Sequence, residues 1–422
     1  MSYKCPPEVL EKIRHFAKFP QTPVSLKQMV NFGSKPTQST LARGTQFIHA
    51  ELPVRLAHRV VELESLPHNL SEMQSVIKVK NMYTQSFQDL IEFPSPSEFG
   101  LETSSWFDRG TLVPPADSAL KAAHTSIRYF KAVEDVAHTE KLAKYNQMFV
   151  KCIEKVKRRH DPVVSTIAQG IVELKEHWRK TNAPYLRDPR DGHSLPLPPP
   201  VQSFLDRFYL SRIGIRMLIG QHVAISKPEA QQPGFVGIIC PKTSLRNVAL
   251  DAIDDARFIC QDYYGLWKAP DIKLYGKQEI EFMYVPSHLH HMLFELLKNS
   301  LRAVVERYGA DCEAYPEIRV VVAEGKEDIT IKISDEGGGI PRSGMPLIWS
   351  YMYTTAESPM LQENYDKSDF KAPMAGFGYG LPLSRLYARY FGGDLKLISM
   401  EGYGTDAYLH LSRLSDSEEP LP

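Results

Sequence analysis

ITIKISDEGGGIP, residues 329–341, joins an alternating strand pattern to a turn that carries a carboxylate and three glycines. Ile329, Ile331 and Ile333 alternate with polar residues, which predicts a strand with one buried face. The strand runs directly into Asp335. An aspartate there can accept a hydrogen bond from an exocyclic amine, and the glycines let a flat ring or a phosphate approach the backbone. Alone, such a sequence is more often only a turn.

The segment before this strand predicts a helix over residues 287–307, which follow Pro286 and are good helix formers. Helical spacing places His291, Glu295, Asn299 and Arg302 on one polar face, opposite an apolar face. Such a stripe can line a site. By itself it also fits the solvated outer face of an amphipathic helix.

Glycines also punctuate the segment after the strand. The sequence GFGYGLPLSRL, residues 376–386, places glycine at every second position before a predicted helix opening. Backbone N–H groups and the positive end of a helix dipole suit phosphate oxygens. The candidate phosphate-binding residues are Gly376, Phe377, Gly378, Tyr379, Gly380 and Leu381. Further on, GYGT at residues 402–405 supplies Thr405 before a strand-like run over residues 407–411.

In this order, the four motifs resemble the ATP-binding domain shared by histidine kinases, gyrase-type topoisomerases and MutL-type repair proteins. The sequence contains neither a P-loop pattern nor the motif set of ordinary protein kinases. YVPSHL at 284–289, FELLKN at 294–299, SYMYTTA at 350–356 and SMEGYGTD at 399–406 are similar to the mitochondrial pyruvate dehydrogenase kinase family. ELPVR at 51–55, RHDPVV at 159–164 and FLDRFYLSR at 204–212 extend the resemblance towards the N-terminus.

The chain departs from the family in two proline-rich stretches, residues 94–125 and 179–200, and its end lacks the Asp-Trp tail of the animal members. That end is similar to the plant-type members. The apolar spacing predicts a helical domain, similar to a four-helix bundle, over residues 1–230. An α/β-sandwich ATPase domain of histidine-kinase type is expected over 235–415, followed by a short tail over 416–422. We expect loops at residues 93–116 and 179–200, where prolines remove helix donors.

The resemblance implies a protein-serine kinase that uses ATP and Mg²⁺ in the mitochondrial matrix. Its substrate would be the E1α subunit of the pyruvate dehydrogenase complex, which phosphorylation inactivates. The resemblance also implies docking of the helical domain to the lipoyl domain of the E2 core, and a homodimer. The first 19 residues carry only a weak organelle-targeting signal.

By the same resemblance, Asp335 and Thr405 would hold adenine, and Asn299 would bind Mg²⁺. Glu295 would accept the serine proton, and His291 one turn earlier would tune that carboxylate. The alternative for Glu295 is that it orients a water molecule in an ATPase. The other residues expected at the nucleotide are Arg302, Gly337, Gly339, Thr354 and Thr355, together with the backbone of residues 376–381.

A second site is implied in the helical half. His160, Arg212 and Arg216 match a family pocket that binds an inhibitory 2-oxoacid, and guanidinium groups suit carboxylates. Two alternatives stay open: His160 could be a phosphoacceptor as in true histidine kinases, or the arginines could form only salt bridges.

Composition limits the remaining function classes. Fifty Lys and Arg balance fifty Asp and Glu, so no overall field attracts nucleic acid or an anionic membrane. No apolar run is long enough to span a bilayer, and the five cysteines show no metal-like spacing. Three alternatives to a pyruvate dehydrogenase kinase remain: a branched-chain 2-oxoacid dehydrogenase kinase, a noncatalytic ATP-binding adaptor, and an ATPase of gyrase or MutL type.

Overall fold

The computed structural model describes residues 6–96, 98–99, 101, 140–181, 197–227, 229, 232–277, 279–354 and 378–421. These residues form two compact units. The first contains the described residues of 6–181 and 211–238 with residue 421, and the second contains those of 197–210 and 239–420. The long helix α8, Pro199–Ile225, contributes its first turns to the second unit and the rest to the first.

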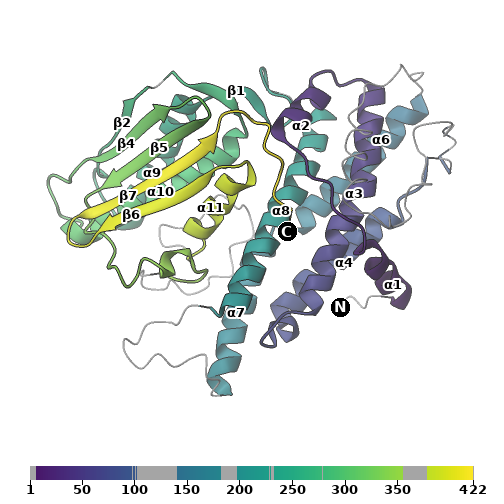
Figure 1. The fold of residues 1–422 in the computed structure, drawn as a ribbon, viewed down its shortest axis with the longest axis horizontal. Helices are drawn as coiled ribbons and strands as arrows, with labels where there is room; N and C mark the ends of the chain where they lie inside the picture. The colour runs from purple at the N-terminus through teal and green to yellow at the C-terminus, as the bar shows by residue number, and fades with distance from the viewer. Residues whose placement is uncertain are drawn as a thin grey trace. The chain divides into compact units, whose positions relative to one another are not determined.

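The first unit is helical (Figure 1). Its other described helices are α1 Pro7–Phe16, α2 Leu26–Gly33, α3 Gln38–Glu64, the short 3₁₀ helix η1 Leu70–Glu72, α4 Gln74–Ile91, α6 Glu140–Arg159 and α7 Val163–Lys180. A capping box between Ser25 and Gln28 starts α2. Inside α3, Arg55 donates to Glu51 at 2.8 Å, and both side chains are buried, so part of the ELPVR motif is an internal ion pair.

The second unit is built on a five-stranded sheet with the order β2-β4-β5-β7-β6. Its strands are β2 Ile272–Gly276, β4 Ile318–Glu324, β5 Asp328–Asp335, β6 Asp394–Met400 and β7 Gly404–Ser412. β2 runs parallel to β4, and the other neighbours are antiparallel. A separate pair joins β1 Cys240–Ser244 to β3 Glu281–Tyr284.

Three helices cover one face of this sheet: α9 Leu245–Tyr264, α10 Pro286–Tyr308 and α11 Gly380–Tyr390 (Figure 1). Ile329, Ile331 and Ile333 are at most 1% exposed, because alternate residues of β5 point towards these helices. The second unit also contains the 3₁₀ helix η5, Leu347–Trp349. Helices on one side of a mixed sheet form the α/β layer expected of the ATPase domain.

The predicted fold class is confirmed. The predicted helix at 287–307 is α10, the alternating strand is β5, and it ends at Asp335 as expected. The predicted loops at 93–116 and 179–200 lie mostly outside the described residues. At the ends of the second one, α7 continues to Lys180 and α8 begins at Pro199.

Candidate active site

Asp335 lies at the end of β5, where β5 pairs with the start of β7. One carboxylate oxygen accepts hydrogen bonds from the backbone N–H of Gly337 at 2.9 Å and of Thr405 at 3.3 Å. The other oxygen accepts from the Ser300 hydroxyl at 2.9 Å. Burial raises the pKa of Asp335, and these hydrogen bonds oppose that rise. The carboxylate is therefore fixed in orientation at 7% exposure.

Arg307, in the last turn of α10, holds the two loops beside Asp335 together. Its guanidinium donates to the backbone oxygens of Glu336 at 2.9 Å, Tyr403 at 2.6 Å and Gly402 at 3.0 Å. The loops also bond to each other directly, through Gly338 N–H to the Tyr403 oxygen at 3.0 Å and Gly402 N–H to the Gly338 oxygen at 2.8 Å. Gly339, at φ 71°, belongs to the same turn. The glycine motif is thus tied to the strand that carries Thr405.

The polar stripe of α10 is not a solvated outer face. Glu295 and His291 are each 7% exposed. Glu295 accepts a hydrogen bond from the Lys298 ammonium at 2.8 Å, and the His291 ring meets the edge of Tyr387 on α11 at 5.2 Å between centroids. α10 therefore presents this face to α11, which carries the end of the glycine-rich loop.

Asn299 and Arg302 follow on the same helix. Among the described residues, the half-buried Asn299 side chain makes no hydrogen bond, so its amide oxygen can serve as a ligand. Arg302 pairs with Glu306 at 2.7 Å, which directs its guanidinium along the helix. No cluster of three or more His, Cys, Asp or Glu that could hold a metal occurs within the described ranges. An amide oxygen suits Mg²⁺, which keeps several waters and takes further oxygens from phosphates.

The phosphate loop is described from Gly378 onward, and the predicted residues Thr355, Gly376 and Phe377 lie outside the described residues. Helix α11 begins at Gly380, with Leu381 following, so their N–H groups open a helix N-terminus. The Tyr379 side chain is buried in a cluster with Tyr209 and Tyr351 and leaves only its backbone for a ligand. Thr354 is half-buried at the edge of the described segment.

The structure also brings the three predicted effector residues together. Arg212 donates to the backbone oxygens of His160 at 3.3 Å and Asp161 at 3.4 Å, and Arg216 donates to the Asp161 carboxylate at 2.8 Å. The His160 ring stacks on Tyr83 at 4.3 Å and bonds to Ser86 at 3.0 Å. Burial, followed by the charges of Arg212 and Arg159, lowers the pKa of His160 to about 3. At 1% exposure this neutral ring is not accessible to ATP, which argues against a phosphoacceptor role.

This burial predicts a pH dependence of stability. Because the pKa of His160 in the folded chain lies at about 3, below its ordinary 6.5, the unfolded chain takes up a proton first as pH falls. The free energy of unfolding should fall below pH 6.5, by up to about 1.4 kcal/mol per pH unit from this residue. Chemical denaturation at several pH values between 7 and 5 gives the free energy of unfolding at each pH. This free energy should fall less per pH unit for His160→Gln than for wild type. An equal fall in the two proteins would contradict the burial of His160 as a neutral ring.

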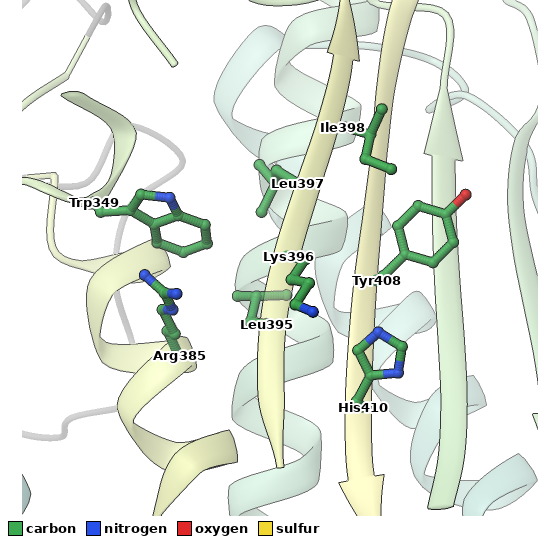
Figure 2. Close-up of a pocket in the computed structure, with 8 residues that line it drawn as sticks. All are labelled: Trp349, Arg385, Leu395, Lys396, Leu397, Ile398, Tyr408 and His410. Carbon is green, nitrogen blue, oxygen red and sulfur yellow. The ribbon is translucent and has the colours of Figure 1, made fainter. Parts of the chain in front are cut away.

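A pocket of about 390 Å³ lies beside the edge strand β6 (Figure 2). Trp349 and Arg385 line one side, with the guanidinium 4.4 Å from the indole ring, and residues of β6 and β7 line the other. None of its lining residues is a predicted nucleotide residue, and it contains no carboxylate or amide side chain. The residues predicted to bind the nucleotide therefore lie elsewhere in the second unit, at Asp335 and at the start of α11.

Comparison with known proteins agrees with this geometry. Residues 284–415 match the family described as "Histidine kinase-, DNA gyrase B-, and HSP90-like ATPase", and residues 23–240 match "Mitochondrial branched-chain alpha-ketoacid dehydrogenase kinase". The mitochondrial pyruvate dehydrogenase (acetyl-transferring) kinase of Arabidopsis thaliana is 45% identical, with 99% of this chain and 97% of the relative covered. The enzyme of Schizosaccharomyces pombe is 43% identical over 97% and 98%. Human isozyme 4 is 40% identical over 98% and 87%.

The chain belongs to the mitochondrial pyruvate dehydrogenase kinase family. The relatives match both halves of the chain, so membership extends beyond the ATP-binding motifs. Membership places this kinase in the mitochondrion and confirms the sequence-based recognition. Among the described residues, no helix of this family member is both long and apolar enough to cross a membrane.

Sequence reasoning missed three side chains that contact the candidate site residues or their loops in this family member: Ser300, Lys298 and Arg307. Ser300 follows Asn299 directly, and its bond to Asp335 depends on α10 packing against β5. Lys298 and Arg307 resemble ordinary solvated lysines and arginines in the sequence. Only the packing of α11 and the two loops reveals their roles.

Proposed function

We propose that this chain is a protein-serine kinase that phosphorylates the E1α subunit of the pyruvate dehydrogenase complex and inactivates it. The observation that carries the proposal is the arrangement of α10 and α11. Glu295 lies against the start of α11, and Asn299 lies one turn further along α10, with its amide bonded to none of the described residues. A noncatalytic adaptor would be expected to lack one of these two side chains, and both are present.

The described residues divide the work of phosphoryl transfer. Asp335 accepts a hydrogen bond from the adenine amine, and Asn299 holds Mg²⁺ through its amide oxygen. The backbone N–H groups of Gly378, Gly380 and Leu381 bind phosphate oxygens at the helix N-terminus. Held by Asn299, magnesium would supply positive charge that offsets the charge of the transferred phosphoryl group. His291 supports Glu295 from the preceding turn.

Glu295 accepts the proton of the attacking serine. The serine oxygen forms a bond to the γ-phosphorus, and the bond between that phosphorus and the β,γ-bridging oxygen breaks. ADP leaves with the bridging oxygen, and the serine proton passes to the Glu295 carboxylate. Positioning and charge neutralisation supply most of the rate in such transfers.

An inactivation assay tests the proposal. Purified pyruvate dehydrogenase complex is incubated with the kinase and Mg·ATP, and its NADH production is followed. We expect progressive loss of activity that requires ATP and is reversed by a serine phosphatase. Full retention of complex activity while ATP is consumed would contradict the proposal.

We further propose that the first unit binds the lipoyl group of the E2 core. An apolar pocket there has no charged wall, because burial lowers the pKa of His222 to about 4 and keeps its ring neutral. An uncharged, slender dithiolane arm suits such walls. The pocket is lined by Val24, Met29, Phe32, Gly44, Phe47, Ile48, Leu218, Gln221, His222 and Ile225.

Phe32 provides the test of this docking pocket, because its side chain is only half-buried. Phe32→Ser removes apolar contact with the lipoyl arm and should weaken binding of a lipoylated E2 domain by at least about 10-fold, since burying such a ring contributes ~1.5–3 kcal/mol. The matched control is Phe258→Ser, which removes a phenylalanine that is 66% exposed. Calorimetry that gives equal affinities for wild type and Phe32→Ser would exclude this pocket.

A homodimer is proposed for the second unit. Ile398 and Met400 are 63% and 67% exposed, and Ile398 and Tyr408 extend from neighbouring strands β6 and β7 (Figure 2). An exposed apolar sheet face favours association with a second copy. Analytical ultracentrifugation of Ile398→Glu tests this dimer, with Leu414→Glu at another exposed site as the control. Only Ile398→Glu should convert the dimer to a monomer.

We also propose that Arg212 and Arg216 bind an inhibitory 2-oxoacid. Arg216 is the cleaner probe, because buried Arg212 also supports two backbone oxygens. Arg216→Gln removes a charge-assisted bond to the carboxylate of about 1.5–3 kcal/mol, so the pyruvate concentration for half inhibition should rise at least 10-fold. Arg179→Gln, at an exposed arginine of α7, is the control. An unchanged inhibition curve would leave Arg216 as only a salt-bridge partner of Asp161.

A further inference from the structure

Lys298 on α10 is a buried lysine. Its side chain is 2% exposed, and its ammonium donates to one oxygen of Glu295 at 2.8 Å. The ammonium also lies 5.3 Å from the centre of the Phe294 ring. Burial of a lysine is unfavourable for folding unless the ammonium is paired, and here the Glu295 carboxylate is its partner.

The other oxygen of Glu295 meets the first residue of α11. A Cβ on Gly380 would lie 2.3 Å from Glu295 Oε2 and 3.3 Å from its carboxyl carbon. No side chain larger than hydrogen fits there unless the carboxylate moves. Glu295 is thus held on one side by an ammonium and on the other by bare backbone at a helix N-terminus, where the dipole also favours negative charge.

This arrangement answers a geometric problem of the reaction. A general base must lie within hydrogen-bond reach of the proton that it accepts, and a glutamate side chain can otherwise adopt several rotamers. A carboxylate that is bonded to an ammonium on one side and packed against backbone on the other keeps a single orientation.

We propose that Lys298 is the positioning residue for Glu295: its ammonium fixes the carboxylate between α10 and the phosphate loop, and Gly380 provides the space that the carboxylate occupies. The inference rests on the proposed function, in which Glu295 is the base. Lys298 acts through Glu295, and nucleotide affinity does not depend on it.

A double-mutant cycle tests the proposal. Lys298→Met keeps the length of the apolar stem and removes the charge. We expect Lys298→Met to lower kcat for E1α phosphorylation at least 50-fold, to change KM for ATP and Kd for ADP less than 3-fold, and to lower kcat less than 2-fold further in the Glu295→Gln background. Loss of the effect in that background separates a role through Glu295 from a general structural role.

Three results would overturn the proposal. The first is a kcat for Lys298→Met within 3-fold of wild type. The second is a double mutant whose fold-decrease in kcat equals the product of the decreases in Lys298→Met and Glu295→Gln. The third is a loss of ADP affinity that accompanies the loss of kcat. The proposed function is tested with wild type and Glu295→Gln alone. Its failure is therefore distinguishable from a failure of the Lys298 proposal.

Gly380→Ala provides a second test should Lys298→Met fail to fold. The added Cβ should displace the carboxylate and lower kcat at least 10-fold. In the Glu295→Ala background, the same substitution should lower kcat less than 2-fold. Equal losses in both backgrounds would contradict the proposed fit of the carboxylate against Gly380.

Discussion

Glu295→Gln is expected to lower the rate of E1α phosphorylation by about 10²–10⁴-fold, the usual contribution of a general base. Glutamine keeps the size of the side chain but has no useful basicity towards a serine proton. It can still accept the hydrogen bond from Lys298, so the packing of α10 against α11 should persist. Single-turnover measurements with Mg·ATP in excess isolate the chemical step.

Binding provides the control for this variant. In the proposed site, Asp335 binds adenine and Asn299 binds Mg²⁺, so the Kd for Mg·ATP should stay within a few-fold of wild type. The melting temperature should change little. A phosphorylation rate within a few-fold of wild type would show that Glu295 is not the base. If the wild-type chain hydrolyses ATP without labelling E1α, and Glu295→Gln loses that hydrolysis, the water-orienting alternative would be favoured.

Asp335→Asn is expected to weaken ATP binding by about 1.5–3 kcal/mol, the range for a hydrogen bond to a charged group. Asparagine is a better replacement than alanine, because the carboxylate is buried and accepts from Gly337, Ser300 and Thr405. Alanine would leave these donors unsatisfied and would destabilise the fold, at ~1–3 kcal/mol for each buried group. Calorimetry with ATP, at matched magnesium, gives the affinity.

Stability separates binding from folding in this variant. Burial raises the pKa of Asp335, so the folded chain takes up a proton at a higher pH than the unfolded chain. The ionised form therefore costs stability above the folded-state pKa, and removal of its charge at neutral pH relieves that cost. The melting temperature of Asp335→Asn should equal or exceed that of wild type. Unchanged ATP affinity would remove Asp335 from the adenine site.

The structure confirms the elements whose apolar residues recur with a clear helical or strand periodicity in the sequence. α10 follows a proline and contains good helix formers, and β5 alternates cleanly, so local sequence was sufficient for both. β6 was missed because Ile398 and Met400 break the alternation by facing outward. β2 was missed because it is a short edge strand whose parallel pairing with β4 depends on contacts far apart in the sequence.

The candidate site divides in the same way. Glycines and carboxylates at turns leave a pattern in the sequence, and Asp335 was found from it. The partners of these groups do not leave one, because the burial of Lys298 and the three backbone contacts of Arg307 arise only when α11 and two distant loops come together. Tertiary packing turns common surface residues into parts of the site.

Phosphosite mass spectrometry tests the central claim most directly. The kinase and Mg·ATP are incubated with equal amounts of purified E1 from the pyruvate and the branched-chain dehydrogenase complexes, and serine phosphorylation is followed over time. We predict that serine on the pyruvate dehydrogenase E1α subunit is labelled at least 10-fold faster than serine on its branched-chain counterpart. Preferential labelling of the branched-chain enzyme, or hydrolysis of ATP with neither E1 labelled, would contradict this account.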